Sequence, residues 1–143
     1  MKLYLVPGAA VALLCLSALG CAVEGGGGAD TFPDKPLATL KTDAGRSVEV
    51  RTSPAQPPSR GESSVELTVI DDAKKPVDDL DPVADLWMPA MGHGASVDPE
   101  TTAEGDGRYR LDRVDLFMPG RWDMHLTFSG KPDDLATAHF QIP

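Results

Sequence analysis

The stretch RWDMHLTF, residues 121–128, determines how the rest of the sequence is interpreted. Its apolar positions alternate without interruption with polar ones, and they are Trp122, Met124, Leu126 and Phe128. Successive side chains of a β-strand point to opposite faces of a sheet, so a strict period of two predicts a strand with one face on a core and the other in solvent. We therefore expect a half-buried antiparallel strand here.

Four further segments show the same alternation, and they are residues 47–50, 64–70, 108–116 and 136–142. The segment 108–116 loses strict alternation between Asp112 and Val114, where we expect a β-bulge. Turn-rich sequences separate the segments, and no stretch has apolar residues at helical spacing over more than one turn. Residues 37–143 are therefore predicted to form one all-β domain, an immunoglobulin-like antiparallel β-sandwich.

Length and composition limit the class of protein. The chain has 143 residues, a hydrophobic fraction of 41% and a formal net charge of −9. This length suits a single domain with a modest core. The acidic balance argues against nucleic acid and against an anionic membrane surface as partners, because both require basic patches.

The N-terminal segment has the composition of a targeting signal. Residues 1–20 contain one lysine near the start followed by an apolar run, which predicts a cleaved signal peptide. The sequence ALGC, residues 18–21, resembles a bacterial lipobox, although Ala18 stands where that pattern prefers a larger aliphatic residue. This resemblance implies that Cys21 is lipidated, that residues 21–36 are a glycine-rich flexible tether, and that the exported protein is lipid-anchored, facing the periplasm or the cell exterior. Plain secretion or an uncleaved anchor is the alternative.

Catalysis is not expected from this sequence. The motifs of phosphate loops, nucleophile elbows and zinc-protease helices are absent from it. The acidic stretch VDDLDPVAD, residues 77–85, lacks the spacing and the central glycine of a calcium loop, so it is interpreted as a solvated turn. Removal of Cys15 with the signal would leave Cys21 as the one cysteine of the mature chain. We therefore predict a non-enzymatic protein with no catalytic residues and no disulfide.

Methionine and histidine gather in DLWMPAMGHG, residues 85–94. Thioether sulfur is a soft ligand that suits Cu(I), and imidazole binds either copper oxidation state. If a second Met-Pro-Gly turn lies at the same end of the sandwich, a copper site would contain Met88, Met91, His93 and Met118. The alternative is structural: Met88 fills the core, His93 lies in an exposed loop, and the stretch only closes one end of the sandwich.

Four short motifs give the chain a family resemblance. They are KPV at 75–77, MPAMGHG at 88–94, GDGRY at 105–109 and FMPGRW at 117–122. In this order and spacing they resemble the YtkA-like and FixH-like domain family. The resemblance implies an immunoglobulin-like sandwich of the bacterial envelope, in which some relatives handle copper or accompany copper transport and oxidase assembly. The partners it implies are copper-handling or other envelope proteins; a metal-free adaptor module is the alternative. The lipobox-like start departs from the FixH-like pattern, which has a transmembrane helix there.

Overall fold

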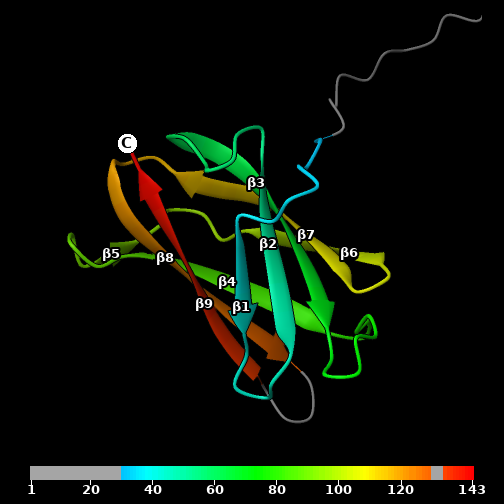
Figure 1. Ribbon diagram of the computed structural model, residues 1–143. Coiled ribbons are helices and arrows are strands. Elements are labelled where there is room, and N and C mark those ends of the chain that lie inside the picture. Colours follow the sequence, from blue (N-terminus) through cyan, green and yellow to red (C-terminus); the bar gives the residue numbers. More distant parts are fainter. Residues whose placement is uncertain (1–29, 130–133) are drawn as a thin grey trace, which may run out of the picture.

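The computed structural model of the protein describes residues 30–129 and 134–143 (Figure 1). The predicted signal peptide, residues 1–20, and the predicted lipidation site, Cys21, lie outside the described residues. Within the described part, no helix is long and apolar enough to cross a membrane.

The described chain forms two antiparallel sheets. The strands are β1 (Ala38–Lys41), β2 (Ser47–Ser53), β3 (Gly61–Ile70), β4 (Asp81–Met88), β5 (His93–Gly94), β6 (Glu100–Gly105), β7 (Arg108–Leu116), β8 (Gly120–Ser129) and β9 (Asp134–Ile142). One sheet has the order β1-β2-β3-β7-β6 and the other β5-β4-β8-β9 (Figure 1). The all-β prediction is confirmed as a two-sheet fold; the closer immunoglobulin-like relationship stays a prediction.

The core lies between the sheets and consists of the apolar positions of the alternating segments. In β8 the side chains of Trp122, Met124 and Phe128 are fully buried, and in β3 those of Val65 and Leu67 are too. The polar residues between them remain on the outer faces, as a period of two requires. Met124 is thus the core residue that its position predicts.

The predicted bulge in the 108–116 segment is present. Between Ser63 and Val65, β3 advances by two residues while β7 advances by three, and Arg113 has a φ of 62°. The extra residue restores Val114 to the buried face after the alternation has slipped, so the core continues to the end of β7.

Four of the strands were not located from the sequence, and they are β1, β4, β5 and β6. β4 contains part of the acidic stretch that was interpreted as a turn: Asp81 and Asp85 project from its exposed face while Ala84 and Leu86 are buried. Acidic side chains on one face concealed the alternation of β4. β6 has no buried position because it is an edge strand, so it carries no apolar period.

One end of the sandwich is closed by two of the four motifs. The hydroxyl of Tyr109, at the start of β7, donates to the Val77 main-chain oxygen over 2.8 Å and accepts from the Leu80 amide at 3.2 Å. A Cβ on Gly107 would lie 2.5 Å from the Val69 main-chain oxygen, so only glycine permits this approach. The KPV and GDGRY motifs are therefore explained by packing between the β3–β4 connection and the start of β7.

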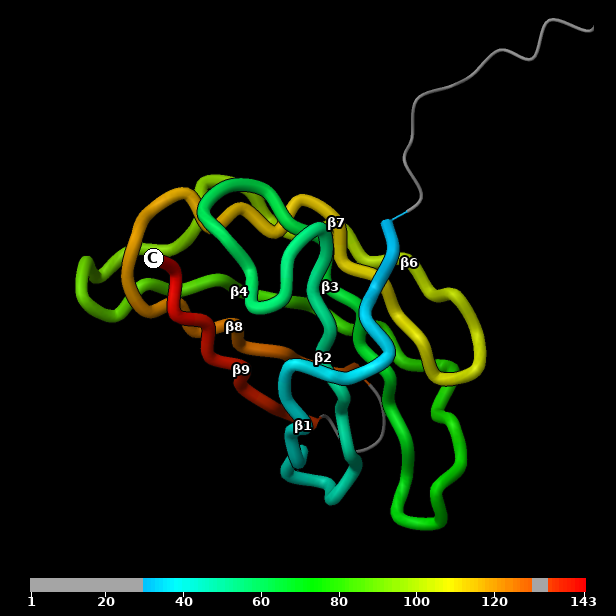
Figure 2. The backbone as a smooth tube through the Cα atoms, turned by 45° about the horizontal axis from the view of Figure 1, so that its top comes forward, coloured from blue at the N-terminus to red at the C-terminus, as the bar shows by residue number. Residues whose placement is uncertain are grey.

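Residues 30–37, called the N-terminal strap below, precede β1 and lie against the outer face of the five-stranded sheet (Figure 2). The Asp30 carboxylate accepts a hydrogen bond from Ser64 in β3, and the main-chain oxygen of Asp34 accepts one from Arg51 in β2. The sequence assigns residues 30–36 to the flexible tether; in the structure Asp30 and Asp34 of this segment contact the sheet.

Candidate metal-binding end of the sandwich

The two Met-Pro turns lie at the same end of the sandwich, opposite the end closed by Tyr109. The β4–β5 hairpin turns directly after Met88, whose main-chain oxygen accepts the amides of Met91 and Gly92 at 3.1 and 3.0 Å. The β7–β8 turn begins after Leu116 and ends at Gly120. β4 pairs antiparallel with β8. The end of β4, where the first turn begins, therefore lies beside the start of β8, which follows the second turn.

Contact between the turns is direct at Met88 and Gly120. An added Cβ on Gly120 would lie 2.7 Å from the terminal methyl of Met88, and Gly120 has a φ of 124°. Glycine therefore serves two purposes in the Met-Pro-Gly turn: it adopts a backbone conformation that other residues avoid, and it leaves room for the methionine below.

His93 is held against the second turn by aromatic packing. Its ring stacks on Phe117 with the centroids 6.2 Å apart and the planes 12° from parallel. Phe117 in turn makes a T-shaped contact with buried Trp122, with the ring centroids 5.4 Å apart. The indole N–H of Trp122 donates to the main-chain oxygen of Met118 over 2.9 Å, which fixes the turn. The stack therefore couples the His93 loop to the core through Phe117.

One nitrogen of the His93 ring has a partner that determines the tautomer of the neutral imidazole. Nδ1 lies 3.0 Å from the main-chain oxygen of Gly94. A carbonyl oxygen only accepts, so Nδ1 carries the hydrogen and the lone pair is at Nε2. A histidine that ligates a metal usually donates its other ring N–H in this way.

The four predicted ligands differ in exposure. Met88 is buried with 3% of its surface exposed, and Met91 is 54% exposed at the tip of the hairpin. Met118 and His93 are partly buried, and Met118 packs against the core. The structure thus brings Met88, His93 and the Met118 turn to one end of the fold and leaves Met91 at the tip of the hairpin beside them. Met88 lies beneath this surface, as its structural interpretation predicts.

The donor types at this end suit a soft ion. Three thioethers and one neutral imidazole carry no charge, which fits Cu(I) better than a hard divalent ion. Among the described residues, no group of three His, Cys, Asp or Glu side chains is placed to hold a metal ion.

A second polar cluster lies on the outer face of the four-stranded sheet, where sequence analysis predicted no site. His139 Nδ1 lies 2.7 Å from an Asp123 carboxylate oxygen, and Arg121 Nε donates to the same oxygen over 2.8 Å. The hydrogen bond from Arg121, helped by His139 and opposed by burial, lowers the pKa of Asp123. Alternation had placed all three residues on one face, but their pairing required the β8–β9 register. Arg121 makes this an ion-pair network rather than a nucleophile and its base.

Comparison with known proteins agrees with the motif order. A family model described as YtkA-like matches residues 42–127, well over half of the chain. No curated protein and no solved structure matches the chain.

Proposed function

The chain belongs to the YtkA-like family, and from that premise we propose that it is a non-catalytic, lipid-anchored protein of the bacterial envelope that binds Cu(I). The binding site is the end of the sandwich that carries the two Met-Pro turns. Met91, His93 and Met118 are the accessible ligands, and Met88 supports them from below.

The observation that carries this proposal is the position of His93. Its ring stacks on Phe117, the residue directly before Met118, although the two are separated by more than twenty positions in the sequence. Its Nδ1–H is used by the Gly94 carbonyl, so the Nε2 lone pair is available to a metal. A soft sulfur donor and an oriented imidazole at one end of a rigid sandwich favour Cu(I).

The lack of charge on these ligands adds to the selectivity for Cu(I). Neutral ligands supply little Coulomb attraction, so the affinity depends on softness and should be greater for Cu(I) than for Zn(II) or Cu(II). Protons compete with a metal for the imidazole, so Cu(I) affinity should fall when the solution is acidified.

The test is a Cu(I) titration of the purified protein under reducing conditions, with a chromophoric Cu(I) chelator as competitor. Substituting alanine for His93 or Met91 should weaken binding more than tenfold, since each removes a ligand, while the fold is retained. The matched control is His125→Ala, which removes an exposed histidine from the outer face of β8. The proposal fails if the wild type binds no Cu(I), or if His93→Ala binds as tightly as His125→Ala.

The lipid anchor has its own experiment. Cys21→Ser should move the protein from the membrane fraction to the soluble fraction, because the acyl chains that hold it are attached to this sulfur. Unchanged membrane partitioning of the variant would assign the anchor to the apolar N-terminal segment instead.

A metal-free adaptor is the second candidate, favoured by apolar side chains on the outer face of the four-stranded sheet. Val83 and Leu135 are 56% and 51% exposed, and they flank Thr127 in one cross-strand row. Trp87, farther along β4, is 38% exposed. Exposed apolar groups that share a face are typical of protein interfaces. A photo-crosslinker at Val83 should then capture an envelope protein in cells, and the same group at exposed Glu104 of β6 should not.

A further inference from the structure

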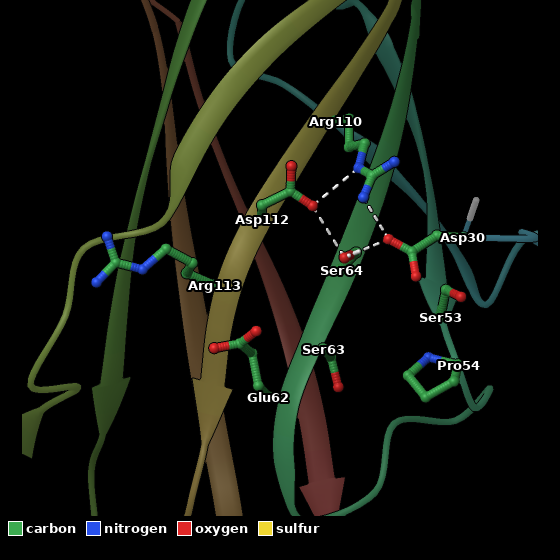
Figure 3. Close-up of a pocket in the computed structure, with 9 residues that line it drawn as sticks. All are labelled: Asp30, Ser53, Pro54, Glu62, Ser63, Ser64, Arg110, Asp112 and Arg113. Carbon is green, nitrogen blue, oxygen red and sulfur yellow. Dashed lines mark hydrogen bonds and ion pairs between the residues drawn. The ribbon is translucent and has the colours of Figure 1, made fainter. Parts of the chain in front are cut away.

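The N-terminal strap, residues 30–37, is attached to the sheet by polar contacts at its two ends. At the first end the Asp30 carboxylate accepts a hydrogen bond from the guanidinium of Arg110. Ser64 Oγ lies 2.8 Å from the same carboxylate oxygen (Figure 3). Arg110 Nε donates to Asp112 over 2.8 Å. Arg110 therefore lies between two carboxylates, one from its own strand and one from the strap.

The other end of the strap joins the sheet through its main chain. The Asp34 oxygen accepts from Arg51 at 3.3 Å, and the Lys35 oxygen accepts from the Gln56 amide at 2.7 Å. The amide of Leu37 donates to the main chain of β2, where the regular pairing of β1 begins. This end is an extension of the sheet, whereas the Asp30 end depends on side chains.

The middle of the strap borders a hollow on the sheet. A cavity of about 510 Å³ is lined by Thr31, Phe32 and Pro33 of the strap and by Arg51, Glu66 and Arg108 of the sheet, among others. Thr31 and Pro33 are exposed, and Phe32 is only partly buried beside these charged residues. With little apolar burial between its ends, the strap is retained at β3 and β7 chiefly by the Asp30 contacts.

We propose that the strap is a releasable clasp that sets where the N-terminal tether leaves the fold. With Asp30 docked, the chain leaves over β3 and β7. With Asp30 released, it leaves near Asp34, where the main-chain contacts to Arg51 and Gln56 begin, and the four residues 30–33 add about 13 Å of reach when extended. The effect on reach from a membrane rests on the proposed lipid anchor, whereas docking of the strap does not. The ion pair is partly exposed, so salt weakens the docked state.

The test is ¹⁵N relaxation of the intact protein in detergent micelles, with Asp30→Asn as the variant. In the wild type the amides of Thr31 and Phe32 should have order parameters near those of the strands, about 0.8, and in Asp30→Asn they should fall below about 0.6. The matched control, Asp34→Asn, removes the same charge from the same strap but leaves the Arg110 contact intact, so its order parameters should stay at the wild-type values. Arg110→Gln should release the strap as Asp30→Asn does.

The β3 and β8 amide shifts verify that each variant remains folded. Wild-type order parameters below about 0.6 in the strap, or values in Asp30→Asn equal to those of the wild type, would overturn the proposal. Cu(I) titration of the same variants separates the two proposals. If the wild type binds no Cu(I), the proposed function is refuted and the relaxation result still stands. If the relaxation data show that Asp30 does not dock the strap, Cu(I) binding is unaffected.

Discussion

Replacing Asp134 should destabilise the sandwich more than any surface carboxylate does, because this residue joins the two sheets. It begins β9 and its side chain is fully buried. Its carboxylate accepts the Ala44 amide at 2.7 Å and Arg46 Nη1 at 3.1 Å, both from the β1–β2 turn of the other sheet. Asp43 adds a main-chain bond to Leu135 at 3.2 Å.

The magnitude follows from the burial of the partners. Arg46 has 19% of its side chain exposed, so removing the carboxylate leaves a largely buried cation without its counter-charge. Removing one member of a buried pair typically costs about 3–5 kcal/mol, which is the expectation for Asp134→Ala. Asn keeps the shape and one acceptor and exchanges charged hydrogen bonds for neutral ones, so Asp134→Asn should cost about 1.5–3 kcal/mol.

The pH dependence has a definite sign. Burial by itself would raise the pKa of Asp134, but hydrogen bonds from Thr42 and the Ala44 amide and the charge of Arg46 outweigh it, so the pKa lies below its ordinary value. A carboxyl with a depressed folded pKa stabilises the protein above its unfolded pKa, about 3.9, and loses that contribution as the pH falls through the folded value. The stability difference between wild type and Asp134→Asn should thus be constant above about pH 5 and shrink below about pH 4.

Urea unfolding followed by near-UV circular dichroism at several pH values measures these differences. The control is Asp72→Asn, whose carboxylate is 81% exposed and lies 3.9 Å from Lys41. An exposed pair of this kind contributes at most about 1 kcal/mol. An Asp134→Asn loss no greater than that of Asp72→Asn would refute the inter-sheet role, and a difference that does not shrink in acid would refute the pKa argument.

Two further substitutions test the core and the motif glycines. Met124→Ala should cost about 2–5 kcal/mol in urea unfolding because the side chain is fully buried, and Met91→Ala, at an exposed tip, less than about 0.5 kcal/mol; equal losses would contradict the β8 register. Gly107→Ala should destabilise the domain more than Gly92→Ala: both have a positive φ, but a Cβ meets the Val69 oxygen at 2.5 Å in the first case and nothing within 4 Å in the second. The same stability for both variants would show that the β3–β4 connection yields to the clash.

The sequence by itself determined the part of the core that comes from the five alternating segments. Alternation at Trp122, Met124 and Phe128 is a local property, because the side-chain period of a strand is two in any sheet. The slip of that period between Asp112 and Val114 likewise located the bulge. Motif order was sufficient for the family, which the match of the family model to residues 42–127 confirms.

Tertiary structure alone decided which of the candidate groups meet. The stack of His93 on Phe117, the closure of Asp134 on Arg46 and the docking of Asp30 on Arg110 join residues from 24 to 88 positions apart. Alternation assigns a residue to a face but not to a neighbour, because pairing depends on strand order and register. For the same reason β4 escaped prediction: its acidic outer face resembles a turn until β4 pairs with β8 and Leu86 enters the core.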